Sequence, residues 1–257
     1  MTTRRNDRPL TARSVLASAL LGSDPPALTP ARLVAVAALF GISENATRVA
    51  LSRMVTAGEL AVADGRYRLV GPLLDRHGRQ RQSRRLPAPD WDGTWTQVVV
   101  TSARASAADR TAARAALHRA RLGELREGVW LRPANLAVAL PRPLAATTAR
   151  FAVTPEGDGR ALAASLWDLD GWAAGARDLL ARLAAGRPEG AAALAPGFVL
   201  SAAVLRHLQA DPLLPRELLP RGWPGERLRA RYDAWDAQYR SLLRAYHLGA
   251  LTPSARA

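Results

Sequence analysis

Cysteine and lysine are both absent from this chain of 257 residues. Without cysteine there is no disulfide, no thiolate zinc site and no cysteine nucleophile. Without lysine, all 36 basic residues are arginine. The coding bias of a GC-rich genome is sufficient to explain that choice, but its chemical consequence remains. Arginine makes planar, bidentate contacts with phosphates and with the edge of guanine.

Acidic residues are also few, since 22 Asp and Glu against 36 Arg give a net charge of +14 and a pI near 11.5. Residues 1–90 contain 14 arginines and 7 acidic residues, so about a third of the chain carries +7 of the excess. The densest segment, RHGRQRQSRR at 76–85, has five arginines and no acid. This balance favours a polyanionic partner.

Long apolar runs are lacking as well. The longest uncharged apolar stretch, residues 190–205, is shorter than the ~20 residues of a membrane-spanning helix and is interrupted by Pro196 and Gly197. The N-terminus, MTTRRNDRPL, has no apolar core of the kind that a signal peptide needs. We therefore expect a soluble, cytoplasmic protein with no membrane partner.

Catalytic and metal-binding clusters are not evident. Asp168 and Asp170 in WDLD are better placed to cap a helix than for acid–base chemistry. The segment PEGDGR, 155–160, lacks a P-loop lysine and indicates a turn. The sequence predicts no metal, no cofactor and no enzymatic activity. No histidine has a neighbour at metal-ligand spacing; the four are His77, His118, His207 and His247.

Residues 11–58 predict three short helices, each opened by a polar N-cap and closed by glycine. The caps are Thr11, Thr29 and Ser43. The third helix lies in GISENATRVALSRMVTAGEL, 41–60, and has two distinct faces. Four residues at helical spacing predict a buried stripe: Thr47, Ala50, Leu51 and Met54.

Residues 60–69, LAVADGRYRL, change to the periodicity of strands. Asp64-Gly65 is a strong signal for a two-residue hairpin turn. The resulting register pairs apolar residues on one face and leaves arginines on the other, as Leu60/Leu69 and Val62/Tyr67 against Arg66 and Arg68. Three helices followed by a basic hairpin predict a winged helix-turn-helix.

The face of the third helix opposite the buried stripe is suited to reading DNA. Asn and Arg pair bidentately with adenine and guanine, and such a helix enters the major groove by its N-terminal half. The hairpin arginines would reach phosphates or the flanking minor groove, and Arg13 and Arg32 are candidates for backbone contacts. A solvated arginine face is the alternative for one helix alone; the hairpin and the basic run favour DNA. The predicted DNA-binding residues are Asn45, Arg48, Ser52, Arg53, Arg66 and Arg68.

The middle of the chain predicts a β-α-β-β-(α)-β order, typical of a ferredoxin-like domain. Its segments are a strand at 95–103, a helix at 105–123, two strands around Gly128, and a strand at 149–157. The helix offers Ala108, Ala112, Ala115 and Leu122 for packing.

From residue 166 onward the pattern is helical. The Pro-rich segment 211–225 predicts a rigid packing element, and a last amphipathic helix follows it. The apolar stripe of that helix is Leu228, Tyr232, Trp235, Tyr239 and Leu242.

The predicted fold class is α+β multidomain, with an N-terminal winged helix-turn-helix, a central ferredoxin-like domain and a C-terminal helical domain. The predicted boundaries are 1–72, a basic linker or helix at 73–90, 91–160 and 161–257. Aromatic rings beside cations in the C-terminal half suit an acyl-CoA or aromatic effector, although these tryptophans are as well explained as core or interface residues. The candidate effector residues are Trp167, Trp172, Arg206, His207 and Trp223.

Several segments together resemble the phenylacetic-acid degradation repressor (PaaX-like) family. They are GISENATRVALSRMVTAGEL, GRYRL, WDGTW (91–95), LGELREGVWLRP (122–133), LWDLDGW (166–172) and DPLLPRELLPRGWPG (211–225), in that order. The resemblance implies a homodimeric bacterial transcription regulator, usually a repressor, with a central domain similar to a small CRISPR-adaptation nuclease. It also implies release from the operator by an effector, which is phenylacetyl-CoA in members that control phenylacetate breakdown.

One departure from that nuclease fold is informative. The fold places a metal-binding Asp after its first strand, where this chain has Thr101 and Ser102, and the nearest acid, Asp109, lies within the predicted helix. The leading hypothesis is therefore a dimeric DNA-binding repressor released by an aryl- or acyl-CoA thioester. A metal-dependent nuclease is the alternative, and a sequence-independent architectural protein is a third hypothesis that rests on charge alone.

Overall fold

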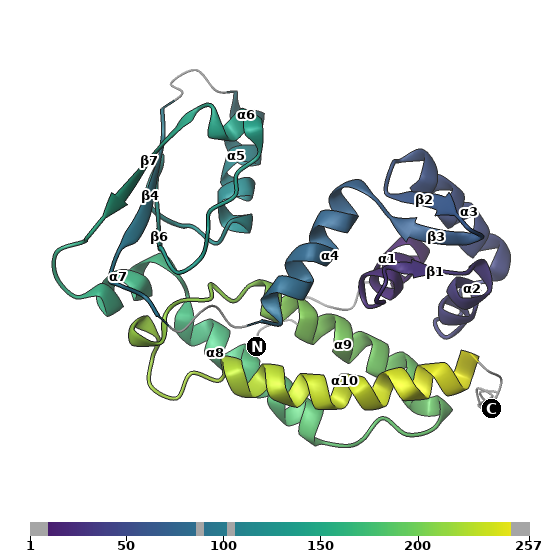
Figure 1. The fold of residues 1–257 in the computed structure, drawn as a ribbon. Coiled ribbons are helices and arrows are strands. Elements are labelled where there is room, and N and C mark those ends of the chain that lie inside the picture. The colour runs from purple at the N-terminus through teal and green to yellow at the C-terminus, as the bar shows by residue number, and fades with distance from the viewer. Residues whose placement is uncertain (1–9, 86–89, 102–105, 248–257) are drawn as a thin grey trace. The chain divides into compact units, whose positions relative to one another are not determined.

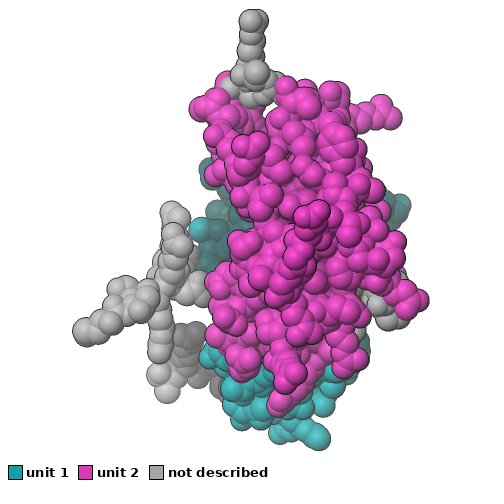
Figure 2. Space-filling view, turned by 90° about the vertical axis from the view of Figure 1, so that its left-hand side faces the viewer, with its two compact units in different colours: residues 1–84, 178–209, 228–257 teal, residues 85–177, 210–227 magenta. Residues whose placement is uncertain are grey.

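The computed structural model describes residues 10–85, 90–101 and 106–247. It is a multidomain α+β protein whose described part contains two small antiparallel sheets (Figure 1). The chain divides into two compact units (Figure 2). Unit 1 comprises residues 1–84, 178–209 and 228–257, and unit 2 comprises residues 85–177 and 210–227. The C-terminal half of the sequence therefore contributes to both units.

Unit 1 begins with three helices, α1 (Ala12–Leu21), α2 (Pro30–Ala38) and α3 (Glu44–Thr56). The side chains of Thr11, Thr29 and Ser43 each accept a backbone N–H of the following first turn, as predicted. These caps satisfy donors that have no partner within a helix. The three helix starts are therefore confirmed.

A three-stranded sheet packs with these helices in the order β1-β3-β2, formed by β1 (Ala27–Leu28), β2 (Leu60–Ala63) and β3 (Arg66–Leu69). The register of the hairpin is the predicted one, with Leu60 opposite Leu69. Asp64 and Gly65 form its turn with φ of 53° and 67°, the left-handed geometry of a tight hairpin. Strand β1 was not predicted.

The apolar face of the hairpin is only partly buried. Leu60 and Leu69 are each 2% exposed, whereas Val62 is 58% exposed. Val62 lies on the edge strand β2 and within two residues of the turn, so fewer neighbours cover it. The expected apolar face is therefore buried only at the end of the hairpin that leads back to the helices.

The basic run belongs to a packed helix, α4 (Gly71–Ser83). Four of its residues at helical spacing are buried: Leu73, His77, Gln80 and Ser83. Gln80 Nε2 donates to the carbonyl of Leu21 at 3.1 Å, and His77 Nε2 hydrogen-bonds to the carbonyl of Ser23 at 3.1 Å. Of the two predicted alternatives, a linker or a helix, residues 73–83 form a helix.

Helices α9 (Leu194–Gln209) and α10 (Gly225–His247) supply the rest of the core of unit 1. Phe198 of α9 packs edge-on against Phe40, with ring centroids 5.2 Å apart. Tyr246 Oη donates to the carbonyl of Ala35 in α2 at 3.3 Å. In the predicted stripe of the last helix, four residues are buried and Leu242 is half-buried; the four are Leu228, Tyr232, Trp235 and Tyr239.

Residues 191–209 are long and apolar enough to cross a membrane by length and composition alone. The helix α9 within them contacts α4, and Val204, Leu205 and Leu208 on it are buried. The packing of these residues in the core of unit 1 is sufficient to account for the apolar composition of the helix.

The sheet of unit 2 has the strand order β5-β6-β4-β7, and each neighbouring pair is antiparallel. The predicted strands are all present, as β4 (Trp95–Val100), β5 (Gly123–Arg126), β6 (Val129–Pro133) and β7 (Thr148–Val153). The helices around them are α5 (Ala107–Arg119), α6 (Arg142–Ala145), α7 (Gly159–Leu166) and α8 (Leu169–Ala184), the last of which continues into unit 1.

Both faces of this sheet are covered. On one face Val98 and Trp130 pack with Leu117 of α5. On the other, Trp95 and Leu131 pack with a cluster drawn from α7, α8 and the Pro-rich segment. Residues 211–215 are buried throughout, so the expectation of a packing element at the start of the Pro-rich segment is confirmed.

Helix α5 packs on a different face from the one that was predicted. Ala108 and Ala112 are exposed and Ala115 is half-buried, whereas Ala116 and Leu117 are buried. The expected burial of Leu122, after the helix, is confirmed. Alanine occurs on every side of this helix, so the apolar periodicity does not distinguish one face from another.

Candidate nucleic-acid interface

Helix α3 has one buried and one exposed face. Thr47, Leu51 and Met54 are at most 2% exposed, and Ala50 is half-buried against the same core. The hydroxyl of Thr47 donates to the carbonyl of Ser43 at 2.9 Å, which satisfies this polar group inside the core. The opposite residues, Asn45, Arg48, Ser52 and Arg53, are all exposed.

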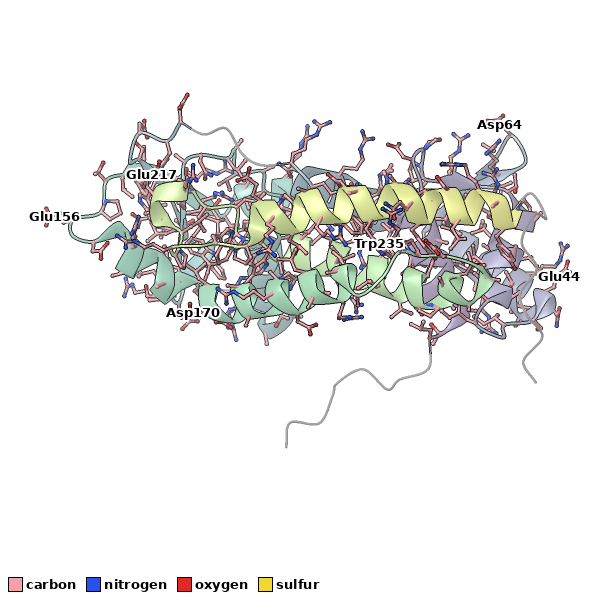
Figure 3. All side chains as sticks on the ribbon, turned by 90° about the horizontal axis from the view of Figure 1, so that it is seen from below. Glu44, Asp64, Glu156, Asp170, Glu217 and Trp235 are labelled. Atoms are coloured by element: carbon pink, nitrogen blue, oxygen red, sulfur yellow. The ribbon has the colours of Figure 1, made fainter. Side chains whose placement is uncertain are left out.

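Arg48 is held along the helix by an acid one turn earlier. Its Nη2 lies 2.6 Å from Glu44 Oε1, and its Nε donates to the same oxygen at 2.9 Å. The two side chains are 66% and 58% exposed. Glu44 lies on the outside of α3 in Figure 3. An exposed i,i+4 pair contributes only about 0.3–0.5 kcal/mol, so Arg48 can exchange this carboxylate for another ligand at little cost.

The hairpin presents two further cations. Arg66 and Arg68 are exposed on β3, and Arg68 Nη2 lies 3.0 Å from Asp64 Oδ2. Asp64 of the turn is labelled in Figure 3. Within the described ranges, neither Arg53 nor Arg66 makes a side-chain hydrogen bond or ion pair. These two arginines can therefore accept an external anion without first losing a partner.

Val49 is a candidate contact that the sequence reasoning missed. It is 43% exposed and lies four residues after Asn45, on the same side of α3. An exposed aliphatic group beside Asn and Arg offers an apolar contact to a thymine methyl group. Its helical spacing from Asn45 was the signal that could have identified it.

Arg13, which was expected to contact the DNA backbone, and two arginines of the basic run have partners within unit 1. Arg13 makes a two-pronged ion pair with Glu59, and the hydrogen bond to that carboxylate raises the pKa of Arg13. In the basic run, Arg81 lies 3.7 Å from Asp24, and Arg84 Nη1 lies 3.1 Å from Asp236. Arg84, with its buried partner, stabilises the unit, whereas the exposed pairs of Arg13 and Arg81 contribute little. Arg32 remains exposed.

The candidate effector residues fall into both units. In unit 2, Trp172 stacks on Trp223 with ring centroids 4.5 Å apart, and Trp167 stacks on Trp95 at 6.4 Å. Trp172 is only 7% exposed. Arg206 and His207 lie on α9, which belongs to unit 1. The tryptophan rings are thus used in packing within unit 2.

Thr101, which follows the first strand of unit 2, and Asp109 in α5 both have structural partners. The hydroxyl of Thr101 donates to the carbonyl of Thr147 at 3.1 Å. Asp109 forms a capping box with Ser106, and the hydrogen bonds from Ser106 lower the pKa of Asp109. Ser102 lies outside the described residues. Among the residues that the structure describes, no group of three or more His, Asp or Glu could hold a metal ion.

Asp168 has the structural role expected for it. Its Oδ1 accepts the backbone N–H of Gly171 at 2.9 Å in the first turn of α8. A carboxylate at this position is favourable because it satisfies a free N–H and faces the positive end of the helix dipole. The capping interpretation of WDLD is confirmed at Asp168.

Three family models match successive parts of the chain: "PaaX-like protein" at residues 11–72, "PaaX protein central Cas2-like domain" at 88–154, and "PaaX-like protein C-terminal domain" at 167–248. Among solved structures, the uncharacterized protein Rv0674 from Mycobacterium tuberculosis is 42% identical, with a TM-score of 0.70, over 92% of this chain and 98% of that chain. No curated protein matches the chain. The first family model spans α1 to β3, which carry the exposed arginines described above.

Proposed function

From the premise that the chain belongs to the PaaX-like protein family, whose members are transcriptional regulators, we propose that it binds operator DNA through a winged helix-turn-helix. Helices α1–α3 and the hairpin β2–β3 would form this module. Helix α3 would enter the major groove, and the hairpin would contact the adjacent backbone or minor groove.

The two-faced character of α3 is the observation that supports this proposal most directly. Three residues of one face are almost completely buried, which fixes the rotation of the helix on its unit. That rotation presents Asn45, Arg48 and Ser52 outward on one side, with Val49 between them. Asn45 and Arg48 would contact base edges, while Arg53, Arg66 and Arg68 would contact phosphates or the flanking minor groove.

For unit 2 we propose a ferredoxin-like fold that mediates homodimerisation. The order β5-β6-β4-β7, with helices after β4 and β6, is the arrangement of a split βαβ unit. Strands β5 and β7 lie at its two edges and expose Leu125 and Phe151, at 50% and 51%. An exposed edge with an apolar side chain suits pairing with a second copy.

We propose that the protein is a cytoplasmic repressor and that a small effector, such as an aryl- or acyl-CoA thioester, releases it from DNA. The candidates for contacts with such a ligand are Trp167, Trp172 and Trp223 in unit 2 and, separately, Arg206 and His207 in unit 1. A metal-dependent nuclease is disfavoured, because Thr101 and Asp109 already have structural partners. Cleavage of DNA or RNA by the pure protein in magnesium would restore that alternative.

Binding to the promoter region upstream of the gene tests the function. Fluorescence anisotropy should show tighter binding to this DNA than to a scrambled duplex at matched salt, since base contacts as well as phosphate contacts would be made. Acyl-CoA thioesters titrated into the complex should release it. Equal affinity for both duplexes would indicate an architectural protein instead.

A further inference from the structure

A cavity of about 110 Å³ lies within unit 1. Helices α1, α2 and α4 and strand β1 line one side, and helices α9 and α10 line the other. Its apolar wall includes Leu28, Val36 and Phe198. Its polar wall includes three arginines and one aspartate: Arg76, Arg206, Arg240 and Asp236.

The aspartate in this wall is already neutralised. Asp236 Oδ2 lies 3.1 Å from Arg84 Nη1 and 2.9 Å from Arg240 Nε. Asp236 is 5% exposed, so these ion pairs hold it in place. Its charge is therefore unavailable to the two remaining arginines of the wall.

Arg76, which is half-buried, and Arg206, which is exposed, form the remaining basic part of the cavity wall. In the described part of the chain, neither side chain makes a hydrogen bond or an ion pair. Arg76 is half-buried, and its pKa is lowered first by burial and then by repulsion from Arg206 and other arginines. A half-buried guanidinium that faces like charge is unfavourable unless an anion neutralises it.

We propose that this cavity binds a small carboxylate that carries a compact apolar group. The carboxylate would be held by Arg76 and Arg206, since guanidinium groups bind carboxylates bidentately. The apolar group would pack against Phe198 and Leu28. A cavity of ~150 Å³ holds benzene, so the space of about 110 Å³ fits an apolar group smaller than benzene, such as a short branched alkyl chain.

The same cavity adjoins the proposed DNA-binding module, and this part of the inference rests on the proposed function. Leu28 lies in β1, where it pairs with Tyr67 between the two hairpin arginines. Val36 lies in α2, which packs on α3. A bound anion would also reduce the positive charge of the unit that meets DNA. The ligand should therefore weaken DNA binding, and DNA should weaken ligand binding by the same factor.

Calorimetric titration of the full chain with isovalerate tests the binding site, with isovaleramide as its uncharged counterpart. Isovalerate should bind and isovaleramide should not. Arg76→Ala and Arg206→Ala should each weaken isovalerate binding roughly 10- to 100-fold, the loss of a charged hydrogen bond. Ala202→Leu, which fills the cavity, should abolish binding, while Arg187→Ala on the exposed surface of unit 1 is the control.

No saturable binding of isovalerate, or equal binding of isovalerate and isovaleramide, would overturn the inference. So would binding of isovaleryl-CoA but not of isovalerate, which would point to a thioester ligand. Melting curves of each variant establish that it is folded. If isovalerate binds but promoter DNA does not, the proposed function fails and the cavity assignment stands. If promoter DNA binds and isovalerate does not, only the cavity assignment fails.

Discussion

Neighbouring residues on α3 have different roles, one in the core and one on the exposed face. The hydroxyl of Thr47 has a partner in Ser43, so this residue can lie in the core, whereas Arg48 is exposed and, among the described residues, pairs only with Glu44. The pair is exposed and weak, so it orders Arg48 in the absence of DNA without preventing its use. The side chains of the proposed DNA-binding face of α3 are thus positioned by contacts with residues close in the sequence.

Arg48→Ala should weaken binding to the specific operator by about 1–3 kcal/mol, because a bidentate base contact is lost. Arg182→Ala is the matched control, since Arg182 makes the same i,i+4 pair with Asp178 away from α3. Glu44→Gln should strengthen binding slightly by releasing Arg48. Anisotropy titrations measure all three; unchanged affinity and footprint for Arg48→Ala would exclude α3 as the recognition helix.

Arg66→Ala should weaken specific and scrambled DNA alike, because a phosphate contact carries no sequence information. The slope of log K against log salt should become less steep by about one unit. A loss confined to the specific duplex would instead place Arg66 at a base edge. Titration at several salt concentrations distinguishes the two results.

At the level of elements, the start of the Pro-rich segment is held against the sheet of unit 2 by a buried polar network. Arg132 is 1% exposed, and burial lowers its pKa to about 10. Its Nη2 donates to Asn135 Oδ1 at 3.1 Å, which turns the amide nitrogen of Asn135 toward the carbonyl of Leu213 at 2.8 Å. Leu213 has φ of 53°, a conformation that only such surrounding contacts maintain.

Asn135→Ala should reduce the free energy of unfolding by roughly 1–3 kcal/mol, since a buried donor and a buried acceptor lose their partners. Amide exchange should become faster in residues 211–215. Asn45→Ala, at an exposed site on α3, is the control and should leave stability unchanged. Denaturant unfolding and hydrogen exchange provide the measurements; equal stability of the two variants would contradict the role of Asn135.

For the molecule as a whole, α10 connects the C-terminal part of the sequence with the N-terminal helices of unit 1. Arg84 lies over the ring of Tyr232 at 5.1 Å, and Tyr246 reaches α2. Tyr232 shares a hydrogen bond of 2.8 Å with Ser201, and Tyr239 donates to the carbonyl of Leu194 at 2.6 Å. Burial is the main cause that raises the pKa of both tyrosines.

This burial predicts a loss of stability in alkali. A raised folded-state pKa means that the contribution of each tyrosine is complete below about pH 10 and is lost as pH rises above it. The free energy of unfolding should fall by up to about 1.4 kcal/mol per pH unit for each tyrosine. Tyr232→Phe and Tyr239→Phe should each make this fall shallower.

Denaturant unfolding between pH 9 and 11 measures the slope. The lowered pKa of Arg132 acts in the opposite direction, but it is common to the parent and to both variants. The comparison between them therefore isolates the tyrosines. If neither substitution changes the slope, the phenol groups do not control alkaline stability.

Local chemistry was enough to predict much of unit 1 and of its candidate interface. The N-caps, the Asp64-Gly65 turn and the alternation of Leu60 with Leu69 act between near neighbours, so the sequence by itself determined the helix starts, the hairpin register and the two faces of α3. The exposed arginines of the interface follow from the same periodicity.

Only the tertiary structure decided what depends on distant partners. The alanine-rich α5 has no unique apolar face, so the sheet that it meets selects Ala116 and Leu117. Likewise, Arg84 and Arg76 belong to the same basic run, yet Arg84 pairs with Asp233 and Asp236 on α10, whereas Arg76 has no counterion among the residues that the structure describes. The distribution of charge along the sequence does not show which arginines form ion pairs, because the acidic partners lie on elements that are distant in the sequence.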